Sequence, residues 1–312
     1  MKKRVLKNVV ASVRNRLLTV ARQSDKPFQE VLILYGLERF LYRLSQSVHK
    51  DKFILKGGLL LIGLGFPQAR PTRDIDLLGL LANDTDTISK IIQEIGGMNI
   101  NDGLGFDFSK ISYEIMSPDS KYPGLRFKFV GHLGQARIPM QIDIGFGDHV
   151  VPDPKEVEFP TLLEMEPPII LSYSLETVIA EKFEAALDLA DLNSRMKDFY
   201  DIWLLSQRYS FNGEIIQEAV TATCRRRKTT IRSDSEMFTD DFAERPDKQI
   251  QWTAFVKKGT FAEVPGKFIR LMTDIRTFLL PIAQSCETKE SFKYLWPTGG
   301  PWSDQKNEMK II

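Results

Sequence analysis

Residues 70–79 read Arg-Pro-Thr-Arg-Asp-Ile-Asp-Leu-Leu-Gly, and this short stretch predicts both a strand and a site. Ile75 and Leu77 are apolar, whereas Asp74 and Asp76 are charged. Because alternate side chains of a strand share a face, Asp74 and Asp76 point the same way, with Cα atoms roughly 6.5 Å apart. Two carboxylates on one face repel each other unless a cation lies between them. Magnesium suits such oxygen ligands, which it commonly shares with substrate phosphates.

A pair of glycines precedes this stretch. Residues 53–56 predict a short strand that ends at Gly57 and Gly58, and the apolar run 59–62 then predicts a buried helix. Backbone N–H groups at such a junction can approach a phosphate, because no Cβ stands in the way. A glycine pair alone is more often a simple turn. Followed by a strand that carries Asp-x-Asp, it indicates a nucleotide-binding site.

A third acid lies in a later predicted strand. Residues 138–144 alternate, with the apolar side chains on one face and Gln141 and Asp143 on the other. If this strand neighbours the Asp-x-Asp strand, Asp143 joins the other two carboxylates as a metal ligand. If it does not, Asp143 is an acid on an exposed sheet face. The order of the strands is not readable from the sequence, so both interpretations stay open.

The chain as a whole predicts an α/β part followed by helices. Roughly the first 50 residues keep helical spacing, 83–95 predict another helix, and strands are expected on both sides of a Gly-containing turn at 131–135. A Pro-rich stretch at 151–168 breaks the pattern, and helical spacing continues from Ser174. We therefore expect a small mixed-sheet α/β domain with N-terminal helices at 1–165, and a mostly helical domain at 166–312.

Composition excludes several classes of protein. Of the 312 residues, 43% are hydrophobic and 27% charged, and the net charge of +1 excludes a uniformly basic nucleic-acid coat. No apolar run approaches the ~18 residues of a membrane span. The N-terminus has no apolar signal core, and only two cysteines occur, so we expect a cytoplasmic protein with no membrane partner. Basic residues cluster before Asp25 and again at 225–228, where they either meet phosphates or form solvated helix faces.

The helical part carries a second set of charged candidates. Lys182 lies within the apolar stripe of a predicted helix, so its amine must reach solvent or find an anion. Asp198 and Asp201 share a side of the next helix, 196–208, which is apolar nearly all round. Burying these acids needs partners, and Lys182, Arg195 and Lys197 are candidates. An ion pair between helices and a nucleotide site are both compatible with this pattern.

Together these motifs resemble the nucleotidyltransferase superfamily related to polymerase β. More narrowly, the chain resembles the AbiEii/AbiGii class of abortive-infection toxins, which belong to type IV toxin–antitoxin systems. One departure concerns the glycine pair, where relatives often have Ser or Thr and this chain continues with Leu59. Phosphate contact there is left to backbone N–H groups. The resemblance runs through residues 35–44, 53–58, 70–79, 142–145, 181–185 and 195–203.

The resemblance implies an enzyme of the EC 2.7.7 type that transfers a nucleoside monophosphate from an NTP, with Mg²⁺ as cofactor. The implied acceptor is RNA, with the 3′ end of tRNA first, so that translation is blocked. A separate antitoxin protein is implied as a partner. The implied site residues are Asp74 and Asp76 as catalytic metal ligands, Gly57, Gly58 and Arg73 at the nucleotide, and Lys182 and Asp198 as further catalytic groups, with Asp201 in support.

Two rival functions remain at this point. One is a nucleotidyltransferase that modifies a small molecule such as an antibiotic. The other is a non-catalytic RNA-binding protein on a degenerate transferase fold, which is disfavoured because Asp74, Asp76 and the glycine pair are all present. Thr72 matches a Ser/Thr position that some relatives phosphorylate, although a loop hydroxyl bonded to its own backbone is the favoured interpretation.

Overall fold

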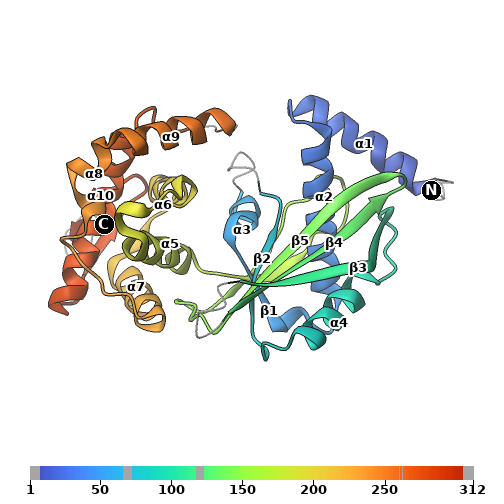
Figure 1. The fold of residues 1–312 in the computed structure, drawn as a ribbon, viewed down its shortest axis with the longest axis horizontal. Helices are drawn as coiled ribbons and strands as arrows, with labels where there is room; N and C mark the ends of the chain where they lie inside the picture. The colour runs from blue at the N-terminus through green and yellow to red at the C-terminus, as the bar shows by residue number, and fades with distance from the viewer. Residues whose placement is uncertain (1–7, 66–71, 117–122, 260, 262, 305–312) are drawn as a thin grey trace, which may run out of the picture. The chain divides into compact units, whose positions relative to one another are not determined.

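The computed structural model describes residues 8–65, 72–116, 123–259, 261 and 263–304 (Figure 1). Arg70 and Pro71 of the quoted stretch, and the basic residues before Asn8, lie outside the described residues. The chain forms two compact units. The first comprises residues 1–147 together with 155–172, and the second comprises 148–154 together with 173–312.

These units divide the chain at a different place from the expected boundary at residue 165. Ile169–Ser172 forms strand β7, which pairs in parallel with β1 and so stays with the sheet of the first unit. Residues 148–154 go with the second unit, because Val151 N donates to Thr177 Oγ1 at 2.8 Å and Ser174 Oγ donates to Val151 O at 2.7 Å. The Pro-rich composition therefore marks the irregular segment but not the division itself.

A seven-stranded mixed sheet forms the first unit, in the order β3-β4-β5-β2-β1-β7-β6. The β2/β5 and β1/β7 pairs are parallel and the other pairs are antiparallel, which confirms the expected mixed α/β fold. Gly134, at φ +60°, lies in the tight turn that joins β4 to β5. The strands are β1 Phe53–Lys56, β2 Ile75–Gly79, β3 Leu104–Met116, β4 Gly124–Leu133, β5 Ala136–Phe146, β6 Lys155–Glu158 and β7 Ile169–Ser172.

Helices cover the apolar face of this sheet (Figure 1). A Cβ on Gly36 of α2 would lie 2.9 Å from Ile138 and 3.2 Å from Met140, so α2 packs directly against β5. On α4, a Cβ on Gly96 would meet Phe108 of β3 at 2.3 Å. The polar side chains of β5 therefore point to the opposite face of the sheet. The helices of this unit are α1 Val9–Gln23, α2 Phe28–Gln46, the 3₁₀ turn η1 Lys50–Lys52, α3 Gly57–Gly63 and α4 Thr85–Gly96.

Charged side chains of α2 are buried behind the sheet. The side chain of Arg43 pairs with that of Asp102 at 2.6 Å, and Glu38 pairs with Arg39 at 2.8 Å. Glu38 also accepts a hydrogen bond from Leu162 N at 2.7 Å, which fixes the loop after β6. Burial raises the pKa of Glu38 to about 7, against the lowering effect of Arg39 and of the Leu162 N–H.

The second unit is mostly helical, as expected. Ser174 caps α5 by accepting from Thr177 N at 3.1 Å, and Asn212 caps α7 in the same manner. A small three-stranded sheet, which the helical spacing did not predict, joins the termini of this unit's helices. Among the described residues, no helix combines the length and apolarity needed to cross a membrane. The elements are α5 Leu175–Leu189, η2 Ala190–Leu192, α6 Met196–Arg208, β8 Phe211–Asn212, α7 Gly213–Arg227, η3 Glu236–Phe238, α8 Asp240–Glu244, α9 Pro246–Lys258, α10 Phe268–Thr288, β9 Tyr294–Trp296 and β10 Ser303–Asp304.

Candidate active site

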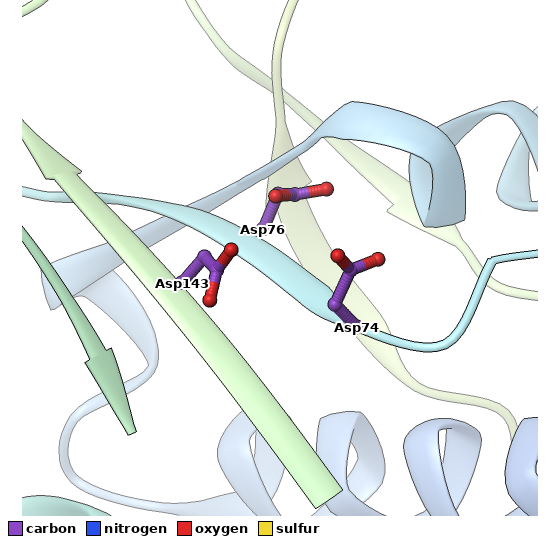
Figure 2. Close-up of side chains that lie close together, drawn as sticks. All are labelled: Asp74, Asp76 and Asp143. Atoms are coloured by element: carbon purple, nitrogen blue, oxygen red, sulfur yellow. The ribbon is translucent and has the colours of Figure 1, made fainter. Parts of the chain in front are cut away.

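Three carboxylates meet on the polar face of the first unit's sheet. Strands β2 and β5 are parallel neighbours, and their register sets Asp76 beside Asp143. Asp74 lies immediately before β2, and one oxygen from each of the three side chains lies within 4.8 Å of the others. Figure 2 shows the three carboxylates gathered over the two strands. The condition on which Asp143 could join the cluster, adjacency of its strand to the Asp-x-Asp strand, is met.

The glycine pair makes room for Asp76. Gly57 has a φ of +69°, and a Cβ at this position would lie 2.0 Å from Asp76 Oδ2 and 2.7 Å from Asp76 Cβ. Both the backbone conformation and the close approach therefore require glycine. Gly58 is buried in the first turn of α3, which has no side-chain cap. The sequence suggested that this pair leaves space for a phosphate, whereas the structure shows that Gly57 leaves space for the carboxylate.

A row of charged residues crosses the sheet at the level of the carboxylates. The register aligns Lys56 of β1 with Asp76, Asp76 with Asp143, Asp143 with Arg126 of β4, and Arg126 with Glu114 of β3. The Arg126 guanidinium donates to both oxygens of Asp143, from Nε at 2.8 Å and from Nη2 at 2.6 Å. These hydrogen bonds raise the pKa of Arg126 above its ordinary value.

Arg126 is the site residue that sequence reasoning missed. It was readable in principle, because a two-residue turn at Gly134–Gln135 pairs residues 133 and 136, and this register carries down to Arg126 opposite Asp143. The alternation of β4 also places Arg126 on the face opposite the buried Leu125 and Phe127. The expected turn at 131–135 is longer than the observed two-residue turn, so it does not give the register that pairs Arg126 with Asp143.

Two further predicted residues lie in the loop before β2. Thr72 Oγ1 donates to Asp74 Oδ1 at 2.8 Å, so its hydroxyl supports the carboxylate rather than its own backbone, which corrects the favoured interpretation. Arg73 is exposed. Its predicted role at the nucleotide stays a prediction.

The second unit holds a buried ion-pair cluster around Lys182. Lys182 Nζ, on α5, lies 2.9 Å from Asp198 Oδ1 and 2.7 Å from Asp201 Oδ2, both on α6. Arg195 Nε lies 2.6 Å from the other oxygen of Asp198. Burial alone would raise the pKa of Asp198, but the charges of Lys182 and Arg195 outweigh it and hold that pKa below its ordinary value. Lys182 thus has two anions inside its own unit.

The basic run at the end of α7 is only partly open to a ligand. Arg227 pairs with Glu184 at 2.8 Å, Glu181 at 3.0 Å and Asp148 at 3.6 Å, so it stabilises the second unit. Arg225 and Lys228 are exposed. Arg227 is therefore engaged by acids of its own unit, and contact of the run with phosphates stays a prediction.

Comparison with known proteins gives one match to a protein family. A family model described as nucleotidyl transferase AbiEii toxin, type IV TA system, matches residues 39–279, which include the glycine pair, the three aspartates and the Lys182 cluster. No curated protein sequence is similar enough to match the chain.

Solved structures show a weaker likeness. The crystal structure of JHP933 from Helicobacter pylori is 14% identical with a TM-score of 0.46, covering 80% of this chain and 90% of that one. A structure of a candidate nucleotidyltransferase from H. pylori is 14% identical with a TM-score of 0.44, covering 81% of this chain and 94% of that one. The family match is therefore the comparison that bears on activity.

Proposed function

Because the chain belongs to the AbiEii family of nucleotidyl transferase toxins of type IV toxin–antitoxin systems, we propose that it transfers a nucleoside monophosphate from an NTP to an RNA acceptor. The observation that carries this proposal is the cluster of Asp74, Asp76 and Asp143, whose ligand oxygens lie within 4.8 Å of one another. A degenerate transferase fold that only binds RNA would have no need to keep three mutually repelling carboxylates together.

The carboxylate cluster fits a divalent cation, and we propose magnesium. Its three donors are hard oxygen ligands. Thr72 donates a hydrogen bond to Asp74, and the missing side chain of Gly57 leaves room for Asp76. When bound, magnesium supplies charge stabilisation at the phosphate under attack and at the leaving pyrophosphate. Asp74 and Asp76 are the principal ligands in this proposal. Asp143 is the third ligand, although Arg126 holds both of its oxygens in the present structure.

The remaining residues are assigned to binding of the nucleotide. We propose that backbone N–H groups at Gly57 and Gly58 approach its phosphates and that Arg73, which is exposed beside Asp74, offsets their charge. Lys182 and Asp198 complete the catalytic set, as the family resemblance implies. What supports them structurally is the burial of a lysine and two acids as one cluster, an expensive arrangement that proteins often keep at functional sites.

The acceptor we propose is tRNA at its 3′ end, which makes the consequence of the reaction a block in translation. Exposed Arg225 and Lys228 offer contacts for a polyanion, and binding through such residues falls as salt rises. A separate antitoxin opposes the toxin, in keeping with the type IV family. We place the reaction in the cytoplasm, where tRNA and NTPs occur.

The test incubates the protein with each labelled NTP, magnesium and total RNA, and then separates RNA from small molecules. We expect label in tRNA, released by a 3′ exonuclease, and no label with Asp76→Asn or with EDTA. Asp76→Asn should melt at the wild-type temperature or above it, because it relieves repulsion between like charges. Label in a small molecule with RNA unlabelled would replace the RNA acceptor by an antibiotic-like one. Absence of label from every pool under all four NTPs would refute transfer.

A further inference from the structure

Arg126 binds Asp143 in the manner that a metal ion would. Its guanidinium donates to both carboxylate oxygens, at 2.8 and 2.6 Å, and the two side chains are 33% and 11% exposed. Bidentate pairing of this kind is the strongest arrangement open to Arg and a carboxylate. Gln141 Nε2 adds a longer contact to Asp143 Oδ2 at 3.4 Å. Both oxygens that the third ligand has to offer are therefore already engaged.

The pairing is specific to Arg126 and is not a general property of the basic residues on this face. Lys128 lies two residues further along β4, on the same side of the strand, and its Nζ contacts Glu114 Oε1 at 2.7 Å. The register sets Lys128 opposite Gln141, whereas Arg126 lies opposite Asp143. Strand β4 thus presents two cations to the site, of which the structure pairs only Arg126 with the carboxylate cluster.

We propose that Arg126 is a built-in counter-ion of the metal site: it holds Asp143 while the metal is absent and releases at least one carboxylate oxygen when a divalent ion binds. This inference rests on the proposed function, because it takes the carboxylate cluster to be a metal site. It makes Arg126 a positioning residue that acts through Asp143. A guanidinium that donates to both oxygens and a divalent cation on the same carboxylate repel each other, so the two compete through charge for Asp143.

The competition predicts a result that a merely structural arginine would not give. Removing Arg126 should tighten metal binding, since the ion no longer displaces a cation, while the metal-free protein becomes less stable because three carboxylates then lack this counter-charge. A structural arginine would lower stability and leave metal affinity unchanged or weaker. The affinity of the metal-free protein for an ion therefore separates the two roles without any measurement of activity.

The experiment titrates Mn²⁺ into the full chain and follows free Mn²⁺ by electron paramagnetic resonance at fixed ionic strength. Arg126→Gln should bind Mn²⁺ on the order of tenfold more tightly than wild type. The ion no longer has to displace Arg126, whose bidentate and partly buried pair with Asp143 is stronger than an exposed ion pair. Lys128→Gln removes the same charge from the same face and should change affinity about twofold at most, because screened charges act weakly at longer range. Arg126→Lys keeps the charge without the bidentate geometry and should fall between wild type and Arg126→Gln.

The outcomes separate the inference from the proposed function. Equal or weaker Mn²⁺ binding by folded Arg126→Gln overturns the inference alone, as does an equal gain in Lys128→Gln. If Arg126→Gln does not fold, Arg126→Lys decides the question in the same way. Failure of wild type and all three variants to bind Mn²⁺ removes the metal site, and the proposed function falls with it.

Discussion

Replacement of Gly57 by alanine tests the geometry of the carboxylate cluster most directly. The added Cβ would lie 2.0 Å from Asp76 Oδ2, 2.5 Å from Asp76 Cγ and 2.7 Å from Asp76 Cβ. A change of rotamer could move the two outer atoms, but the contact with Asp76 Cβ persists in every rotamer. The backbone of β1 or β2 must therefore shift, and Asp76 shifts with it.

The expected effects on stability and activity differ in size. Gly57 has a φ of +69°, and an L-residue in this region costs about 1–2 kcal/mol. The steric contact adds typically about 1–3 kcal/mol, as overpacking does elsewhere. Displacement of a catalytic group by about 1 Å commonly costs on the order of a hundredfold in rate. We therefore expect Gly57→Ala to remain folded, with a lower melting temperature, and to lose about two orders of magnitude in nucleotide transfer.

Gly65 supplies the matched control. It also has a positive φ, +84°, but a Cβ there would have no heavy atom within 4 Å among the residues that the structure describes. Gly65→Ala should lose a similar increment of stability from the backbone and retain transfer. Circular dichroism melting and transfer of labelled nucleotide to RNA measure the two quantities on both variants. Wild-type transfer by Gly57→Ala, in a protein for which Asp76→Asn is inactive, would refute the steric argument.

Three other predictions concern charged groups. Lys182→Met leaves Asp198 and Asp201 buried without their main counter-charge. We expect the free energy of unfolding in urea to fall by roughly 3–5 kcal/mol, and the rate of nucleotide transfer to fall roughly a hundred- to thousandfold. Recovery of both stability and transfer in Lys182→Met/Asp201→Asn would make Lys182 purely structural. Glu38→Gln removes a group whose native pKa of about 7 exceeds its ordinary value of 4.5. The free energy of unfolding of the wild type, but not of the variant, should therefore fall by on the order of 1–3 kcal/mol as pH rises from 5 to 8. Parallel losses in both proteins would contradict this. Arg225→Ala/Lys228→Ala should weaken RNA binding in filter assays and leave NTP binding unchanged. The slope of log affinity against log salt concentration should fall by about 2. An unchanged slope would exclude these residues from the RNA contact.

Much of the fold could be predicted because it depends on local patterns. The strand before Gly57, the Asp-x-Asp strand and α6 follow from apolar spacing and from turn residues, and β1 and α6 begin and end where they were expected. Asp143 was predicted conditionally, since alternation fixes the face of a side chain but not the neighbour of its strand. The structure supplies that neighbour through the parallel pairing of β2 with β5.

The rest depended on contacts between distant parts of the chain. Strand β3 alternates over residues 104–109, but the pattern breaks where the register shifts between Asp107 and Ser112, and most of the strand beyond is exposed, so no continuous alternation marks it as one strand. Arg227 reads as one member of a basic run, although its three acidic partners come from residues 148, 181 and 184. The compact units differ from a boundary at 165 because β7 pairs with a strand more than a hundred residues earlier, which no local composition can show.

Both sets of candidate catalytic groups contain acids that are neutralised within their own unit, and this affects how their variants should be interpreted. Asp143 is held by Arg126, and Asp198 and Asp201 are held by Lys182. Removal of one member leaves a buried or half-buried charge without its partner, which costs more than the pair itself contributes. Loss of activity in such a variant therefore follows from either a chemical or a structural role. Variants that remove both charges of a pair distinguish the two, because they restore neutrality without restoring the chemistry.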